Sequence, residues 1–431
     1  MSFNINDEIS LDFENKKIRV VEKIGEGGQG TVYKVELDGK KYALKWYLNT
    51  PKNSFYKNLK NNIDKGAPDN TFLWPLFLTE KDRSGKFGYI MELRPPEYEE
   101  LSQFLLAKVK FTNVAIMITA ASNICNGFRA LHNKGYSYQD VNDGNFFINP
   151  KNGDVLICDN DNVSPNGQNT GIIGKCRYMA PEVVSGSKPN ANSDRFSLSV
   201  ILFLLLFGNH PLEGKAITST PCMTEKHEKK LYGEKAVFVF DPIDDSNRPV
   251  RGIHKNVLTR WDLYPEYVRK MFREAFSKDV LANPDKRIIE KVWIEKVFQP
   301  LYHELVRCQN GHDQFIDIAK NVYRCSHCNM EYKRPPILNI KNKETALVRD
   351  KKVHEYLISN SDNGNAFDKH IGVVIESPKY PGIFGLRNET NNTWMLTLKD
   401  KSQRPVEPQK PAPLLTGNII SFGNGSSGEV L

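Results

Sequence analysis

The 431-residue chain lacks long apolar runs. Its longest, VILFLLLF from Val200 to Phe207, falls far short of the roughly 20 residues that a membrane-spanning helix needs. The first residues, MSFNINDEISLDFENKK, are polar and acidic, so we expect no signal peptide. A repeat with a period of about 20 to 50 residues is also missing, which argues against solenoids and propellers. We therefore expect no membrane partner.

Charge blocks and paired cysteines are scarce too. The net charge is +8, but Lys and Arg are scattered among acids without a run of about five or six basic residues. We interpret this as a mild bias towards phosphate-bearing ligands and do not expect nucleic acid among the partners. Of seven cysteines, only Cys308, Cys325 and Cys328 cluster. This usage indicates a reducing, cytoplasmic compartment with a metal site, not a disulfide framework.

What is present is enough for two or three globular domains, with 39% hydrophobic and 26% charged residues. Residues 16–48 and the segment GYIMEL at 88–93 have strand patterns. Residues 51–66 and 112–133 have helical periodicity, and the chain after residue 190 is mostly helical. A strand-rich start before a helix-rich body predicts an α+β fold with two lobes.

The sequence pattern changes from helical to strand-like from about residue 340. Short β-type runs such as HIGVVIESP and TWMLTLK alternate there with Gly, Asn and Pro turns. This pattern predicts a small β-sandwich over residues 336–431. The Pro-rich stretch RPVEPQKPAP, residues 404–413, is expected to be a loop within the sandwich or a flexible stretch beside it.

A glycine cluster, IGEGGQGTVYKV, carries Gly25, Gly27 and Gly30 in a G-x-G-x-x-G pattern. A dinucleotide site would need a helix next, whereas here a second strand pattern follows. In a strand–turn–strand unit such glycines let the backbone approach phosphates, and Val32 would cover a base. A plain glycine-rich hairpin turn explains the same letters equally well. Fifteen residues after Gly30, the segment YALK offers Lys45 for the phosphates.

A second set of motifs follows at fixed spacing. Asp140 and Asn145 are five residues apart, as in the kinase pattern H-R-D-L-x-x-x-N. Asp159 ends a strand fourteen residues after Asn145. The segment GKCRYMAPEVV comes next, with Ala180, Pro181 and Glu182, and Asp194 and Arg287 complete the series.

With these motifs in this order, the chain resembles the eukaryotic-like (Hanks-type) protein kinases over roughly residues 15 to 305. The resemblance implies a kinase domain over residues 1–305, with an N-lobe at about 15–93 and a C-lobe at about 94–305. It implies transfer of the γ-phosphoryl group of ATP to Ser or Thr of protein substrates, with autophosphorylation and with Mg²⁺ or Mn²⁺. Ser164 and Thr170 are the first candidate phosphorylation sites.

The resemblance also implies roles for single residues. Asp140 would accept or orient the substrate hydroxyl proton, Asn145 and Asp159 would hold Mg²⁺, and Lys45 would pair with the α- and β-phosphates. Glu182 and Arg287 would form a structural ion pair, and Asp194 would brace the catalytic loop. The remaining nucleotide-binding residues would be the glycine-rich turn, the purine-facing residues, the gatekeeper and the hinge: Gly25, Glu26, Gly27, Gly28, Gly30, Val32, Ala43, Met91, Glu92 and Leu93.

Several letters depart from the family pattern. The usual His-Arg before Asp140 is Tyr138-Gln139, and the usual Lys two residues after it is Asn142. The Asp-Phe-Gly triplet is Asp-Asn-Asp at residues 159–161. No Glu lies between Lys45 and Glu80, so the partner of Lys45 on the regulatory helix is missing, and Asp64 is the nearest acid in register. These departures motivate an alternative, a pseudokinase that binds nucleotide and signals as a scaffold.

Cys308 and His312 form a C-x₃-H pair and Cys325 and Cys328 form a C-x₂-C pair, with twelve residues between the pairs. Two such pairs give the four N/S ligands of a structural Zn²⁺ in a zinc ribbon over residues 306–335, with His327 as a competing ligand. Free thiols are the alternative.

The layout is also similar to a bacterial kinase subgroup in which a zinc element and a forkhead-associated-like β domain follow the kinase. That resemblance implies a metal-dependent protein phosphatase and a von Willebrand A-type protein as partners. Landmarks of phosphothreonine binding are not evident, so an interaction module without phosphopeptide affinity is expected.

Overall fold

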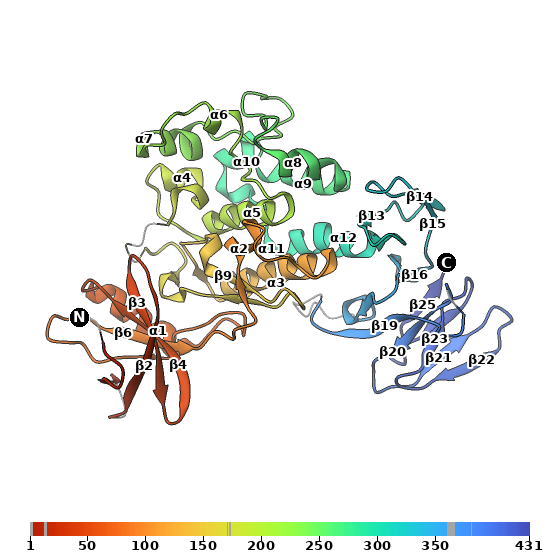
Figure 1. The fold of residues 1–431 in the computed structure, drawn as a ribbon, viewed down its shortest axis with the longest axis horizontal. Helices are drawn as coiled ribbons and strands as arrows, with labels where there is room; N and C mark the ends of the chain where they lie inside the picture. Colours follow the sequence, from red (N-terminus) through yellow and green to blue (C-terminus); the bar gives the residue numbers. More distant parts are fainter. Residues whose placement is uncertain (1–2, 13–14, 170, 172–173, 360–366, 381) are drawn as a thin grey trace. The chain divides into compact units, whose positions relative to one another are not determined.

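The computed structural model describes the chain except residues 1–2, 13–14, 170, 172–173, 360–366 and 381 (Figure 1). It divides into two compact units. The first comprises Met1–Lys110, Gly127–His254 and Phe272–Ile288, and the second comprises Phe111–Asn126, Lys255–Met271 and Ile289–Leu431. The predicted domain limits at 305 and 335 stay predictions, since these units are compact bodies and not sequence-defined domains.

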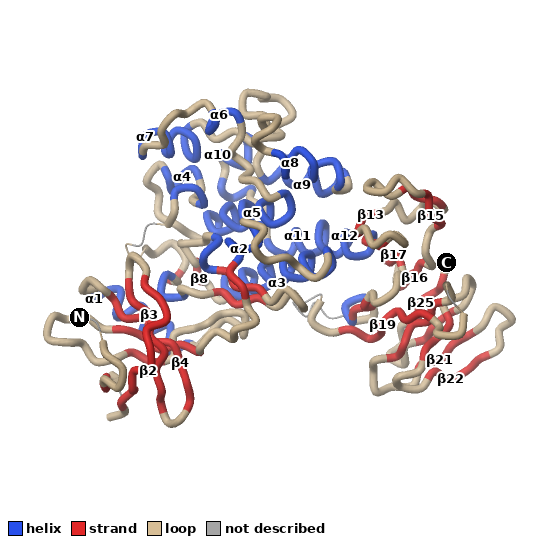
Figure 2. Tube along the Cα trace, viewed as in Figure 1, coloured by secondary structure: helices blue, strands red, loops and turns tan. Residues whose placement is uncertain are grey.

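The first unit begins with a six-stranded antiparallel sheet in the order β1-β2-β3-β4-β6-β5 (Figure 2). Its strands are β1 (Glu8–Ser10), β2 (Lys17–Glu26), β3 (Gly30–Leu37), β4 (Lys40–Tyr47), β5 (Phe77–Leu78) and β6 (Gly88–Glu92). Helix α1 (Asn53–Lys65) ends at Gly66, whose φ of 71° suits glycine. Its Phe55 and Leu59 pack with Tyr47 and Tyr89 of the sheet in one apolar cluster. The predicted strands and helix of this region are confirmed.

The rest of the first unit is mainly helical, with short strand pairs around the predicted catalytic loop. β7 and β10 flank β9 in a three-stranded sheet, and β8 pairs with β11. Helix α5 begins with a capping box formed by Asn190 and Ser193, and nearly all of its residues are buried, as its apolar sequence requires. The elements are β7 (Glu99–Glu100), α2 (Leu101–Leu105), β8 (Tyr136–Ser137), β9 (Phe146–Ile148), β10 (Val155–Ile157), β11 (Ser164–Pro165), α4 (Pro181–Val184), α5 (Ala191–Phe207), α6 (Lys215–Thr218), α7 (Glu225–Glu228) and α10 (Lys278–Ala282).

Helix α3 (Val114–Asn133) runs through both units. By length and composition alone it could cross a membrane, but 56% of its most apolar window is buried inside the protein. Core helices of soluble proteins pass the same test, so the helix carries no membrane assignment. The second unit also holds α8 (Lys255–Arg260), most of α9 (Glu266–Ala275), α11 (Glu290–Trp293) and α12 (Gln299–Glu304).

The C-terminal part of the second unit is rich in sheet. Two hairpins come first, β12 (Leu305–Arg307) with β13 (Asp313–Phe315) and β14 (Val322–Arg324) with β15 (Glu331–Lys333). A six-stranded sheet, β17-β16-β25-β24-β21-β22, and a four-stranded sheet, β18-β19-β20-β23, then enclose one apolar core that includes Val374 and Trp394. The predicted sheet-rich C-terminal region is therefore present. Its strands are β16 (Ile337–Ile340), β17 (Lys343–Ala346), β18 (Lys352–His354), β19 (His370–Glu376), β20 (Phe384–Asn388), β21 (Trp394–Thr397), β22 (Gln403–Val406), β23 (Pro411–Pro413), β24 (Ile419–Ser421) and β25 (Ser427–Val430).

The interpretation of residues 404–413 as a loop or flexible stretch was wrong. Residues of this stretch belong to β22 and β23, which are the last strands in the order of each sheet. Proline lacks an N–H, but an edge strand needs hydrogen bonds on one side only, so Pro405, Pro411 and Pro413 are tolerated there. Edge prolines also discourage pairing with other chains.

Candidate active site

The predicted phosphate-covering glycines lie at the turn between β2 and β3. Gly25 and Glu26 end β2, and the N–H of Gly27 donates to the Gly30 carbonyl at 2.9 Å. A Cβ at Gly30 would lie 2.7 Å from the Trp46 carbonyl oxygen, so only glycine allows β3 and β4 to come this close. A Cβ at Gly27 or Gly28 would meet no described atom within 4 Å. The tip of the turn is therefore open to a ligand.

The apolar surface predicted for the purine comes from three segments. Ala43 of β4 pairs with Met91 of β6, and the predicted residues fall into one apolar cluster: Val32, Ala43, Met91 and Leu93. Leu156 of β10 joins the same cluster and was missed by the sequence analysis. Its only signal was its place three residues before Asp159. The Glu92 carboxylate pairs with Lys40 at 2.8 Å, so contact from Glu92 to a base would come from its backbone.

Lys45 is buried in β4 and directs its ammonium group at two carboxylates. Its Nζ lies 3.0 Å from Asp161 Oδ2 and 3.3 Å from Asp159 Oδ1. The Tyr47 hydroxyl donates to Asp161 Oδ2 at 2.6 Å. Burial alone would lower the pKa of Lys45, but Asp161 and Asp159 raise it on balance, so the ammonium stays charged.

Asp161 is the partner that the sequence analysis failed to find. Its side chain is fully buried (0% exposed), and it reaches Lys45 from the loop after β10 instead of from helix α1. Asp64, the acid in register on α1, is exposed. Helix α1 contacts this loop differently, through Asn58 and Asn62, whose Nδ2 groups each donate to the Val163 carbonyl at 2.8 Å. The signal was the second Asp of the Asp-Asn-Asp triplet.

The catalytic-loop residues lie next to the segment after β10 that carries Asp159, which itself lies two residues beyond the end of the strand at Ile157. Asn145 donates through Nδ2 to the Asp140 carbonyl at 2.9 Å, and its own carbonyl accepts from the Cys158 N–H at 2.9 Å. Asp159 has a left-handed backbone with φ of 50°. Burial raises the pKa of Asp140, while a 3.1 Å hydrogen bond from Asn142 opposes that rise. Asn145 Oδ1 and the Asp159 carboxylate are oxygen donors, which fits them to hold Mg²⁺.

The predicted brace of this loop is confirmed. Asp194 accepts hydrogen bonds from the backbone N–H groups of Tyr138 at 2.6 Å and of Gln139 at 3.0 Å. It also lies 3.1 Å from Nε2 of His132. These contacts hold Gln139 in a left-handed backbone conformation, with φ of 75°.

Of the two candidate phosphorylation sites, Ser164 and Thr170, the structure describes only Ser164. Ser164 is buried (1% exposed), and its hydroxyl donates to the Gln168 carbonyl at 2.9 Å, so it is not accessible in this conformation. Thr170 lies outside the described residues.

The predicted ion pair between Glu182 and Arg287 is also confirmed. It is bidentate, with Nη1 2.7 Å from Oε1 and Nη2 2.6 Å from Oε2. Arg287 Nη1 also donates to the Asn192 carbonyl at 2.9 Å. This arrangement ties the segment that follows the predicted active site to the start of α5.

The four predicted metal ligands converge in the second unit. Cys308 and His312 lie in the turn between β12 and β13, and Cys325 and Cys328 lie between β14 and β15. Their ligand atoms all lie within 4.8 Å of one another. His327, the competing ligand, is not in this group, and its ring stacks on His312 with centroids 5.2 Å apart.

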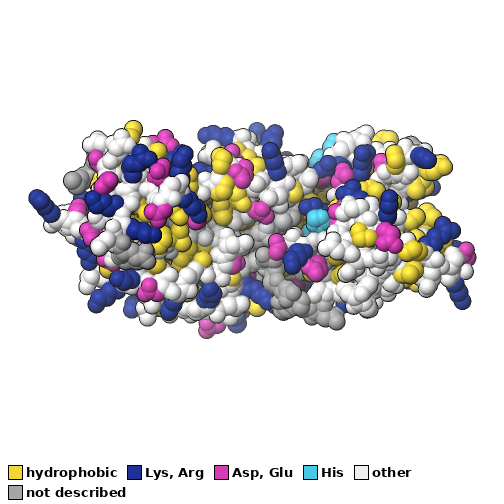
Figure 3. Space-filling model, turned by 90° about the horizontal axis from the view of Figure 1, so that it is seen from below, with side chains coloured by type: hydrophobic (Ala, Val, Ile, Leu, Met, Phe, Trp, Pro, Cys, Tyr) yellow, Lys and Arg dark blue, Asp and Glu magenta, His cyan; other side chains and the backbone are white. Residues whose placement is uncertain are grey.

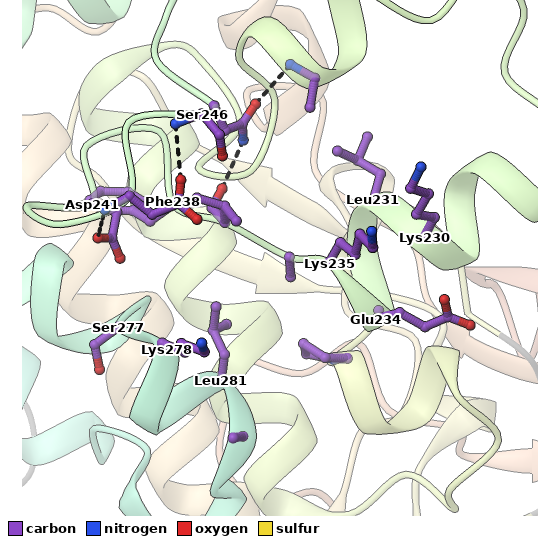
Figure 4. A pocket seen from close by; sticks show the side chains of 18 of the residues that line it. Lys230, Leu231, Glu234, Lys235, Phe238, Asp241, Ser246, Ser277, Lys278 and Leu281 are labelled. Carbon is purple, nitrogen blue, oxygen red and sulfur yellow. Dashed lines mark hydrogen bonds between the residues drawn. The ribbon is translucent and has the colours of Figure 1, made fainter.

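A separate hollow of about 1390 Å³ lies in the first unit (Figure 4). Asp241 and Ser246 line one side of it, and Lys230 and Glu234 line the opposite side. None of the predicted nucleotide or Mg²⁺ residues lines this hollow, so it is distinct from the candidate active site.

Known proteins that are similar to this chain include protein kinases of bacteria and of a mammal. Protein kinase YegI of Escherichia coli strain K12 is 24% identical over 309 residues, covering 66% of this chain and 45% of that protein. Protein kinase C delta type of Rattus norvegicus is 27% identical over 201 residues, covering 44% and 29%. The probable serine/threonine-protein kinase PknB of Corynebacterium glutamicum is 29% identical over 100 residues, covering 22% and 15%. The chain thus spans less than half the length of these curated relatives.

The match to a family model assigns the chain to a protein family. The protein kinase domain model matches residues 18–260, more than half of the chain. The matched segment contains the glycine-rich turn, Lys45, the loop of Asp140 and Asn145, and Asp159. With this match beside the geometry of the site, the chain belongs to the protein kinase domain family.

Proposed function

We propose that the chain is an ATP-dependent protein kinase that transfers the γ-phosphoryl group to Ser or Thr hydroxyls of protein substrates, including its own. The observation that carries this is that Lys45 lies 3.3 Å from Asp159 and Asn145 hydrogen-bonds the Asp140 carbonyl, while the tip of the glycine-rich turn is open. The Ser/Thr preference is supported by the family resemblance and by the name of the Corynebacterium relative.

Each residue has a chemical task in this proposal. Lys45 neutralises the α- and β-phosphates, and Asp140 takes up the proton of the substrate hydroxyl. Asn145 and Asp159 hold Mg²⁺, which when bound neutralises charge on the phosphates. The raised pKa of Asp140 makes its carboxylate a better proton acceptor than an exposed aspartate.

A pseudokinase remains the second candidate, motivated by the missing helix glutamate and the Asp-Asn-Asp triplet. The pairing of Lys45 with Asp161 weakens its first motive, because the lysine is held and charged without a helix acid. Incubation of the protein with ATP and Mg²⁺, followed by mass mapping of phosphosites, separates the two. Incorporated phosphate supports the enzyme, whereas nucleotide-dependent thermal stabilisation without phosphate supports the pseudokinase.

For the second unit we propose a structural Zn²⁺ held by Cys308, His312, Cys325 and Cys328. The distances from His312 Nδ1 are 3.5 Å to Cys308 Sγ and 3.7 Å to Cys325 Sγ. Zinc bonds of about 2.0 Å to nitrogen and 2.3 Å to sulfur give tetrahedral edges of about 3.5 to 3.8 Å, so the group fits. With four protein ligands, the metal would stabilise two hairpins that have little core of their own.

Elemental analysis should find one zinc per chain, and Cys308→Ser should lose it. Cys222→Ser, at an exposed cysteine elsewhere, is the matched control and should keep the metal. Only trace zinc in unoxidised wild-type protein would contradict the site. Retention of zinc by Cys308→Ser together with its loss from His327→Ala would contradict the ligand set.

We propose further that the sandwich is a forkhead-associated-like interaction module without phosphopeptide affinity, and that the protein is cytoplasmic. A metal-dependent phosphatase and a von Willebrand A-type protein stay the expected partners, supported only by the subgroup resemblance. Nucleic acid is not proposed: on the face seen in Figure 3, Lys and Arg are interspersed with Asp and Glu. Co-purification with each partner, with and without residues 336–431, tests the module.

A further inference from the structure

The catalytic loop lacks a cation. Residues 135–150 contain no Lys or Arg, and Asn142 stands where the family pattern carries a lysine. Phosphoryl transfer concentrates negative charge on the oxygens of the moving group, and positively charged side chains beside it lower the barrier. A cation from elsewhere in the chain that lies beside Asp140 would take the place of this lysine.

Lys175 lies at this place. It belongs to the segment before Ala180, and its Nζ donates to Asn142 Oδ1 at 2.9 Å. The same Nζ is 3.8 Å from Asp143 Oδ1 and would be 3.8 Å from a Cβ placed on Gly144. The lysine therefore contacts the catalytic loop at the position where the loop's own lysine is missing.

The backbone around Lys175 is fixed against Asp140. A Cβ on Gly174 would lie 3.2 Å from Asp140 Oδ1 and 3.3 Å from the Gln139 carbonyl oxygen, so the backbone next to Lys175 packs directly on the catalytic loop. Asn142 bridges the pair, because its Nδ2 donates to Asp140 Oδ1 at 3.1 Å while its Oδ1 accepts from Lys175. The amide thus sets the distance between the proton acceptor and the ammonium group.

The ammonium group can also bind a ligand. It has three N–H donors, and one of them is used by Asn142. The Lys175 side chain is 61% exposed, so its other donors face solvent that a substrate can displace. By contrast, Lys45 is 6% exposed and is held by two carboxylates.

We propose that Lys175 supplies the ammonium group that the catalytic loop lacks and is a catalytic residue that binds the γ-phosphoryl oxygens. The inference rests on the proposed kinase function. In the step, the substrate hydroxyl oxygen forms a bond to the γ-phosphorus, and the bond from that phosphorus to the β–γ bridging oxygen breaks. The bridging oxygen keeps the electron pair and leaves with ADP. The hydroxyl proton moves to Asp140, and Lys175 keeps its protons while it compensates the charge.

The first test compares phosphate transfer by the full chain and by single variants. Lys175→Met should lower kcat by roughly 10²-fold, the usual cost of one lost charge-stabilising donor. Lys188→Met, at an exposed lysine of the same unit, should keep wild-type kcat. The exchange variant N142K/K175N, which returns the cation to the loop, should recover part of the loss. Thermal midpoints of all variants report whether a loss of rate is merely a loss of fold.

A second measurement does not need turnover. Because Lys175 is placed at the γ-phosphoryl group, Lys175→Met should weaken binding of a non-hydrolysable ATP analogue by about tenfold and leave ADP binding unchanged. Equal ATP-analogue to ADP affinity ratios in wild type and Lys175→Met would overturn the proposal. So would an active wild type with an equally active Lys175→Met variant. An inactive wild type would overturn the proposed kinase function instead, and the affinity ratio would still decide whether Lys175 contacts the γ-phosphate.

Discussion

Replacing Asp161 by Asn tests the substitute partner of Lys45. The change keeps the size of the side chain and removes its charge, which leaves the buried ammonium with Asp159, at 3.3 Å, as its remaining carboxylate and with Gln29 Oε1 at 3.4 Å. Breaking one side of a buried ion pair costs about 3–5 kcal/mol. Because Asp159 remains in place, we expect the lower end, about 3 kcal/mol of local stability. The Tyr47 hydroxyl also loses its charged acceptor, which adds roughly 1 kcal/mol.

The assay is native-state hydrogen exchange of the β4 amides, which reports the free energy of local opening. Asp38→Asn is the matched control, because Asp38 also pairs with a lysine, Lys16, at 3.1 Å but is 70% exposed. Exposed pairs contribute about 0–1 kcal/mol, so the control should change little. ATP affinity should fall in Asp161→Asn only, since Lys45 loses its orientation. A β4 opening energy in Asp161→Asn within about 0.5 kcal/mol of the control would refute the reasoning.

Two further predictions concern packing and pH. Gly30→Ala should destabilise the first unit by about 1–3 kcal/mol, because the added Cβ would clash with the backbone of Trp46. Gly27→Ala, where a Cβ meets no described atom, should leave stability unchanged. Thermal midpoints of the two variants test this, and equal midpoints would contradict it. Burial lowers the pKa of Lys351 to about 7, against an opposing effect of Glu304. From about pH 7 to 10.5 the unfolded chain then binds more protons than the folded chain, so this lysine makes stability rise with pH. Lys351→Met should flatten that rise in thermal midpoints measured across the window, and an unchanged slope would exclude the effect.

Local sequence patterns were enough to predict the helices and strands near the site, but they did not predict some of the contacts between side chains. Alternation in GTVYKVEL and the apolar letters of α5 are local signals, and both elements formed as expected. Spacing also located Asp140, Asn145 and Asp159, because the chain between them is short and its path is constrained. The four cysteine and histidine ligands converge for the same reason, since each pair is confined to one tight turn.

Local patterns could not predict that a residue from a distant part of the sequence takes the place of a usual family residue. Asp161 replaces a helix acid from a loop 116 residues after Lys45 in sequence, and Lys175 reaches Asn142 from 33 residues away. Such exchanges depend on tertiary proximity, which a single sequence does not encode locally. The loop prediction for the Pro-rich stretch was wrong for a related reason. Proline is excluded from a central strand but not from an edge strand, and the order of strands in a sheet is a tertiary property.

The most direct test of the central claim is transfer of labelled γ-phosphate from ATP, with Mg²⁺, by the wild-type chain and by Asp140→Asn. We expect time-dependent incorporation by the wild type into itself or an added protein substrate. In Asp140→Asn that rate should fall by at least about 10²-fold, with nucleotide binding and thermal midpoint retained. Equal incorporation by the two proteins would contradict the role of Asp140, and no incorporation by the wild type would contradict the kinase itself.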